Sequence, residues 1–206
     1  MFRIFLLIAV LALIASPALA DSVGDFSFIP ILGDLGTSRT FTAGTFSLTA
    51  NGFNGTLATN MWAKNEGPTE FGLGLATGVD REISNDDFVQ LNLTPILALN
   101  PSAVSLGINS IQGSDSYNIW GSNTAGSLGV LLATNQTSST FNLEPWAKTY
   151  DFFSVTSPQG SVLISALDVS TPEPGTLVLL IAGIFGVFYF GKKFVLSHQS
   201  TVSESR

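Results

Sequence analysis

The chain has 206 residues, and its 15 acidic and eight basic side chains give a formal net charge of −7. Between Asp21 and Thr171 there are 13 acidic and four basic residues, a balance that argues against nucleic acid as a partner because phosphate neutralisation needs clustered Lys and Arg. Cysteine is absent, which excludes disulfides and thiol chemistry.

Residues 1–20 have the pattern of a secretory signal peptide. Arg3 supplies one positive charge, an apolar stretch runs from Ile4 to Ile14, and the segment ends in an Ala-x-Ala site at Ala20. An uncleaved N-terminal anchor is the alternative, but the apolar stretch is short for one. We therefore expect cleavage after Ala20 and an export domain over residues 21–170, long enough for a single domain with its own core.

The export domain has a β pattern throughout. Short segments rich in Phe, Val, Leu, Ile and Thr alternate with clusters of Gly, Asn, Ser and Pro, and no segment shows helical periodicity. We expect an antiparallel β-sandwich of the jelly-roll type. The expected strands are 26–32, 40–49, 56–62, 71–76, 88–93, 103–111, 117–120, 129–133, 150–156 and 161–169.

The densest polar group lies at residues 80–87. Asp80, Glu82, Asp86 and Asp87 could supply the oxygen ligands that Ca²⁺ prefers, although their spacing is not that of an EF-hand. The alternative is a solvated acidic turn between two strands. The sequence therefore predicts no cofactor, with calcium as the one candidate.

Residues for catalysis are scarce. The single histidine, His198, lies outside the export domain, which excludes a Ser-His-Asp triad and a His-based zinc site within that domain. A glycosidase would need two carboxylates held about 5–10 Å apart, and the sequence cannot pair the four available glutamates, Glu66, Glu70, Glu82 and Glu144. We expect a protein that is not an enzyme.

Aromatic residues offer a second kind of binding site. Their flat faces could stack on sugars, although packing in the core is the commoner role in a sandwich. Trp146 is the candidate for a glycan contact, because Pro145 and the charged residues nearby indicate an exposed loop. The other candidates are Trp62, Trp120, Tyr117 and Tyr150.

The C-terminal region has three consecutive parts. Residues 171–175 contain Pro172, Glu173 and Pro174, residues 176–191 are uncharged, and Lys192 and Lys193 open a final stretch over 192–206. The apolar part is at the lower length limit for a helix that spans a bilayer, and the lysine pair predicts a cytoplasmic C-terminus. From physics alone this is a membrane anchor behind an extended, proline-rich linker.

The order Pro-Glu-Pro, Gly-Thr-Leu, short apolar helix and basic residues resembles the PEP-CTERM sorting signal of Gram-negative bacteria. The resemblance covers Pro172 to Lys193, and the chain departs from the family in having only two lysines and a 13-residue extension after them. It implies export, an exosortase-type processing enzyme as partner, transient residence in the inner membrane, and release to the cell surface or an exopolysaccharide matrix. Residues 114–129, a strand, a Gly/Asn turn and a strand, also resemble a segment of exported domains with this tail.

The sequence thus favours an exported structural or adhesive protein of a biofilm matrix, with extracellular polysaccharide as a partner. The alternative is a calcium-dependent carbohydrate-binding module or a carbohydrate-active enzyme.

Overall fold

A computed structural model describes residues 24–28, 31–44, 46–85 and 87–171 of the chain. Ala20–Pro172 forms one compact unit. The expected signal peptide, the Pro-Glu-Pro linker and the membrane segment at 176–191 lie outside the described residues. Among the residues that are described, no helix is long and apolar enough to cross a bilayer.

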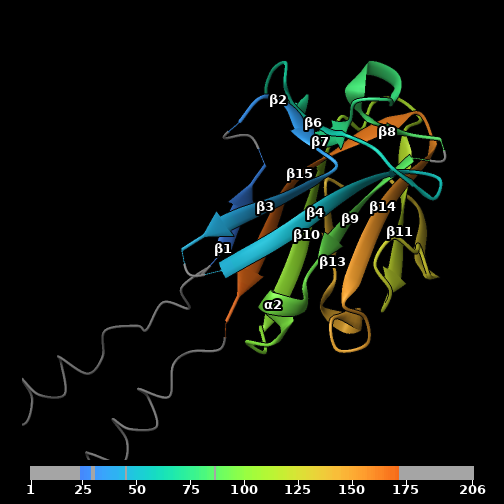
Figure 1. Cartoon of the computed structure of the whole chain (residues 1–206). Coiled ribbons are helices and arrows are strands. Elements are labelled where there is room, and N and C mark those ends of the chain that lie inside the picture. Colours follow the sequence, from blue (N-terminus) through green and yellow to red (C-terminus); the bar gives the residue numbers. More distant parts are fainter. Residues whose placement is uncertain (1–23, 29–30, 45, 86, 172–206) are drawn as a thin grey trace, which may run out of the picture. The chain divides into compact units, whose positions relative to one another are not determined.

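The domain consists of two antiparallel sheets, which confirms the expected all-β sandwich (Figure 1). Sheet A contains, in spatial order, β13 (Thr140–Asn142), β10 (Ala103–Asn109), β15 (Ser161–Ser170), β7 (Phe71–Leu75), β6 (Met61–Asn65) and β2 (Gly33–Gly36). Two further strands, β1 (Gly24–Ser27) and β8 (Ile83–Ser84), pair with β15.

Sheet B contains, in spatial order, β12 (Val130–Gln136), β11 (Ser116–Ser122), β14 (Phe152–Gln159), β9 (Asp87–Asn92), β4 (Phe46–Asn54) and β3 (Ser38–Ala43), with β5 (Leu57–Ala58) paired to β4. Three short helices complete the described elements: η1 (Val79–Arg81), α2 (Thr94–Leu97) and η2 (Glu144–Trp146).

The core lies between the two sheets and follows the period-2 alternation of the strands. In β4, Phe46, Leu48 and Ala50 point inward and are buried, whereas the residues between them are half-buried. The buried apolar residues of both sheets belong to one cluster that includes Leu91 from sheet B and Ile164 from sheet A. A chain without disulfides therefore depends on this cluster for its stability.

Strand β15 is the central strand of sheet A. One of its edges pairs with β10 along its length, and the other pairs in turn with β8, β7 and β1. Gly24 of β1 lies opposite Val169, so both ends of the described domain leave from the same end of the sandwich. Ten residues at about 3.3 Å each separate this end from Ser161 by roughly 30 Å.

Several strand boundaries differ from the sequence prediction. The expected strand 40–49 is a hairpin, in which β3 and β4 are joined through Gly44 with φ of 58°. The expected strand 26–32 covers only the end of β1 and stops short of β2. The short strands β8 and β13 were not predicted, because two or three residues carry no recognisable alternation.

Candidate functional site: a buried lysine among four carboxylates

The site begins with the outward-facing residues of β6. Met61 and Ala63 point into the core, so Trp62 and Lys64 lie on the outer face of sheet A. Their cross-strand partners on β7 are glycines, with Lys64 opposite Gly72 and Trp62 opposite Gly74. Because Gly72 and Gly74 have no side chains, another segment can lie directly on this face of the sheet.

That segment is the loop around η1. A Cβ atom placed on Gly74 would collide with the carbonyl oxygen of Arg81, and one placed on Gly78 would collide with that of Glu82. Asp80 and Arg81 both have left-handed backbone conformations, with φ of 54° and 62°. This turn directs Asp80 toward Lys64 and lays the Arg81 guanidinium over the Trp62 ring at 3.8 Å.

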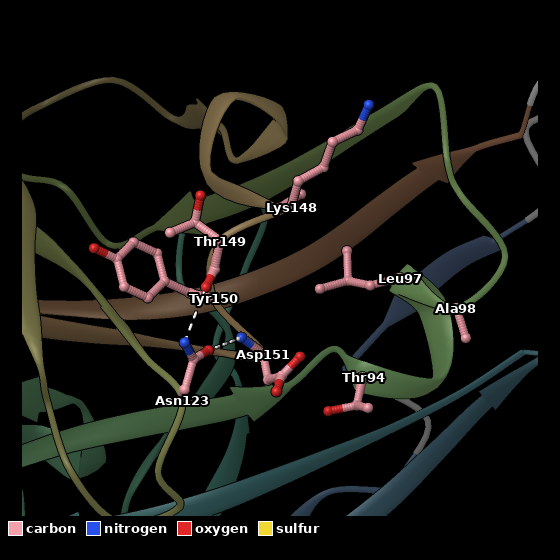
Figure 2. A pocket seen from close by; sticks show the side chains of 9 residues that line it. Thr94, Leu97, Ala98, Asn123, Lys148, Thr149, Tyr150 and Asp151 are labelled. Carbon is pink, nitrogen blue, oxygen red and sulfur yellow. Dashed lines mark hydrogen bonds between the residues drawn. The ribbon is translucent and has the colours of Figure 1, made fainter.

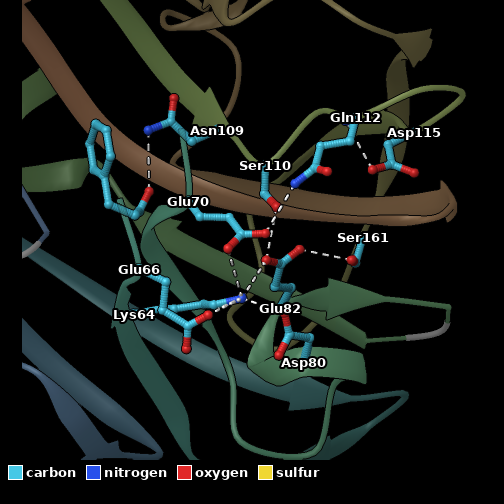
Figure 3. A network of polar contacts seen from close by, with 11 residues as sticks. Lys64, Glu66, Glu70, Asp80, Glu82, Asn109, Ser110, Gln112, Asp115 and Ser161 are labelled. Atoms are coloured by element: carbon cyan, nitrogen blue, oxygen red, sulfur yellow. Dashed lines mark hydrogen bonds and ion pairs between the residues drawn. The ribbon is translucent and has the colours of Figure 1, made fainter. Parts of the chain in front are cut away.

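Four carboxylates meet the Lys64 ammonium, as Figure 3 shows. The distances from Nζ are 2.5 Å to Asp80, 3.0 Å to Glu82, 3.4 Å to Glu66 and 3.8 Å to Glu70. The Lys64 and Glu82 side chains are each 3% exposed. We call these five residues the Lys64 cluster. If all five groups are ionised, its formal charge is −3.

Glu82 is the best satisfied carboxylate of the cluster. Besides Lys64, it accepts hydrogen bonds from the hydroxyl groups of Ser110 and Ser161, each at 2.8 Å. Ser110 has a left-handed backbone with φ of 60°. These contacts tie the loop around η1 to β15 and to the end of β10. They compensate for removing the Glu82 carboxylate from water.

The pKa of Lys64 reflects two opposing effects. Burial lowers it, because the charged ammonium loses hydration. Hydrogen bonds and charge interactions with Asp80 and Glu82 raise it, and together they outweigh burial. The net direction is upward, so Lys64 remains a cation at neutral pH and is not a general base.

Carboxylate oxygens of Glu70, Asp80 and Glu82 lie within 4.8 Å of one another, which is compact enough to hold a metal ion. However, the Lys64 ammonium already contacts all three groups. A Ca²⁺ ion at this place would have to displace that ammonium. The Lys64 ammonium therefore occupies the position that a metal ion would take among these carboxylates.

An open depression of about 400 Å³ lies beside the cluster. Gln112 on its rim donates to Glu70 at 3.0 Å through its side chain and to Asp115 at 3.0 Å through its backbone N–H. The depression is therefore polar and acidic.

The structure places the four predicted calcium ligands differently. Asp80 and Glu82 come together in the Lys64 cluster, whereas Asp87 is buried at the start of β9 opposite Asn54. Asp86 lies outside the described residues. The alternative interpretation as a solvated turn is wrong for Glu82 and Asp87, which are 2% and 6% exposed.

Lys64 has no predicted role in the sequence, where Glu82 is a candidate calcium ligand and the glutamates cannot be paired. The structure brings Glu66, Glu70 and Glu82 to Lys64. The available signal was a lysine that directly follows the apolar residues 61–63.

The proposed glycan residue, Trp146, ends η2 and is half-buried. Its ring stacks on Phe141 with centroids 5.6 Å apart, and Tyr117 contacts the same Phe141 edge-on. The expected exposed loop is thus a short helix whose Glu144 and Pro145 are exposed while Trp146 packs against the core.

The remaining aromatic candidates do not form one platform. Trp62 lies under Arg81 on sheet A, and Trp120 of sheet B donates its indole N–H to Thr156 at 3.0 Å. Tyr117 is fully buried and donates to the carbonyl of Ser138 at 2.8 Å. Tyr150 lines a depression.

That depression, of about 500 Å³, lies between α2 and the segment that follows η2 (Figure 2). Asn123 fixes one wall, since its side chain donates to the Thr149 carbonyl at 3.0 Å and accepts from the Asp151 N–H at 2.9 Å. A neighbouring depression shares Leu97 and Lys148 and includes Ser102. Because the Ser102 N–H donates to the carbonyl of Ser170, these depressions lie near the end of β15 from which the chain leaves.

No protein-family description, curated protein or solved structure matches the chain.

Proposed function

We propose that the chain is an exported protein, sorted by a PEP-CTERM-type tail, whose β-sandwich has a structural or adhesive role at the cell surface or in an exopolysaccharide matrix. The observation that carries the proposal is the place where the sandwich ends. Strand β15 stops at Ser170, directly before Pro172, Glu173 and Pro174. All of the described strands thus precede the expected sorting sequence.

The ends of the domain support the same proposal. Pairing of β1 with β15 brings Gly24 and Val169, near the two ends of the described domain, to one end of the sandwich. Removal of a leader at Ala20 and cleavage near Pro174 would leave every described strand in place. The first and last described strands pair as neighbours, which is also consistent with a jelly-roll type of sandwich.

The tail would act in a defined sequence. The apolar segment at 176–191 would hold the protein in the inner membrane, with Lys192 and Lys193 on the cytoplasmic side. Pro172 and Pro174 would keep the linker extended for an exosortase-type enzyme. After cleavage, the sandwich would be free to join the surface or the matrix.

Intact-mass analysis of protein released from a Gram-negative host with an exosortase tests this proposal. We expect a chain that begins at Asp21 and ends near Pro174. A matched variant, Glu173→Ala, should remain in the membrane fraction with its tail intact. Wild-type protein that is exported but always ends at Arg206 would overturn the sorting proposal and identify a permanent anchor.

A second candidate function is saccharide binding. It is favoured by the depression between α2 and the segment that follows η2, where Tyr150 and Asp151 lie beside Lys148 and Thr94. Aromatic, carboxylate and amine groups together suit a polyhydroxylated ligand. Glycan binding by the full chain that is lost in Asp151→Ala but kept in Trp146→Ala would support this depression, and the reverse result would support Trp146 instead.

A further inference from the structure

Strand β12 is an edge strand of sheet B, and no other described strand pairs with its outer side. Edge strands expose unpaired N–H and C=O groups, and proteins usually shorten, cover or charge them. The other three edges are protected in these ways: β13 has three residues, β2 has four and contains Asp34, and β3 carries Arg39 and lies against β1. By contrast, β12 has seven residues with no proline and no charge.

The start of β12 exposes two large apolar side chains to solvent. Val130 is 54% exposed and Leu131 is 44% exposed, although both are large hydrophobic residues. Leu131 lies opposite the half-buried Trp120 of β11, so the apolar surface continues from the edge onto the outer face of the sheet. Leu132, half-buried, packs against the core and fixes the strand from the other side.

The distribution of charged residues favours a second copy of the chain as the partner at this edge. Residues 116–143 contain no Asp, Glu, Lys or Arg, whereas the rest of the export domain carries 13 acidic residues against four basic ones. Two copies of such a domain repel each other over most of their surfaces. The uncharged edge is where this repulsion is smallest, and a charged partner would find no counter-charge there.

The geometry limits how much of the strand can pair. The register between β11 and β12 shifts twice, and Asn135 has a left-handed backbone with φ of 51°. Such irregularities twist an edge strand. One shift lies at Leu132 and the other lies between Ala133 and Gln136. The segment available for pairing is therefore the part before Asn135, residues 130–134, which contains one bulge.

We propose that two copies of the chain associate through antiparallel pairing of β12 with β12, which joins their B sheets across a two-fold axis. In such an isologous contact each N–H and C=O of one strand has its counterpart on the other. The exposed Val130 and Leu131 side chains of both copies would become covered. This inference does not depend on how the tail is processed.

Sedimentation of the full chain in detergent, over a concentration series, tests the proposal. We expect wild type to form dimers and Leu131→Lys to be monomeric with an unchanged circular dichroism spectrum. The matched control is Thr42→Lys, an exposed position on β3 at the opposite edge of the same sheet, which should still dimerise. A monomeric wild type, or dimers that persist in Leu131→Lys, would overturn the proposal.

Cross-linking provides an independent measurement because the chain has no cysteine. Leu131→Cys treated with a short bis-maleimide should give a covalent dimer, and Thr42→Cys should give little. Equal cross-linking of the two variants would show random collision and count against pairing through β12.

Discussion

The Nζ atom of Lys64 lies 3.0 Å from Oε1 of Glu82, and the two side chains are equally buried. They come from different elements, β6 and the end of the loop around η1, so their contact fixes that loop on the outer face of sheet A. The pair is held further by Ser110 and Ser161, which donate to Glu82. Removing either partner would leave the other charge buried.

Lys64→Met should lower the free energy of unfolding by about 3 kcal/mol, because Glu82 keeps its burial and loses its counter-ion. Urea denaturation followed by tryptophan fluorescence measures the change. Lys148→Met is the control, since Lys148 is exposed and forms no ion pair among the described residues. Its effect should stay within about 0.5 kcal/mol. Equal losses in both variants would show that the Lys64 cluster does not stabilise the fold.

Calcium should stabilise Lys64→Met more than wild type. Without the ammonium, Glu70, Asp80 and Glu82 retain oxygens within 4.8 Å of one another and no cation between them. Ca²⁺ can then occupy the vacated position. Melting temperatures with Ca²⁺ and with a chelator measure the difference. An equal rise in both proteins would place calcium binding away from Lys64.

Asp168→Asn should stabilise the domain at neutral pH. Asp168 is exposed, but partial desolvation first, and then the charge of Asp25 directly opposite on β1, raise its pKa above the ordinary value of 3.8. The ionised form is therefore disfavoured in the folded state, so this group reduces stability above its folded pKa and has no effect below its ordinary pKa.

The expected gain from Asp168→Asn is about 0.2–1 kcal/mol, as for like charges opposite each other in a sheet. Denaturation curves at neutral and acidic pH check this, and the gain should vanish in acid. Asp25→Asn should produce a smaller gain, because it removes the repulsion but not the desolvation of Asp168, and the double variant should give less than the sum of the two. Full additivity would contradict a repulsion between the two carboxylates.

Tyr117 should ionise only in strong alkali. Burial raises its pKa to about 12, and its hydroxyl donates to the Ser138 carbonyl. Since an unfolded tyrosine ionises near pH 10, Tyr117 costs stability as pH rises from about 10 to 12 and has no such effect below that range. Absorbance at the phenolate band should show one late-titrating group that is missing in Tyr117→Phe. Simultaneous titration of all tyrosines in the folded protein would contradict this.

The sequence predicts best those strands whose own apolar residues mark the face that is buried. Strands β7, β10 and β15 lie close to their expected positions because apolar residues mark the inner face. In β9 the alternation does not predict burial: Phe88 and Gln90 are buried although they point away from the core. The loop before β12 covers Gln90, which donates to the Ser127 carbonyl at 2.9 Å and accepts from the Gly126 N–H at 2.7 Å.

The Lys64 cluster could be predicted only in part. The acidic group at 80–87 is visible in the sequence. The burial of Lys64, which pairs with Asp80, depends on a loop that lies 14 or more residues further along the chain. Long-range packing of this kind leaves no periodic signal. In the sequence, the glycines of β7 indicate only a weakened strand and do not show that a loop packs on them.

Strand β15 joins the Lys64 cluster at Ser161 to the tail-bearing end at Ser170. A pulling force on the tail would run along this strand, nearly perpendicular to its hydrogen bonds with β10 and β1. Those bonds would then be loaded together in shear instead of opening one after another. The sandwich should therefore resist a force applied along β15 better than one that peels β15 from a neighbouring strand.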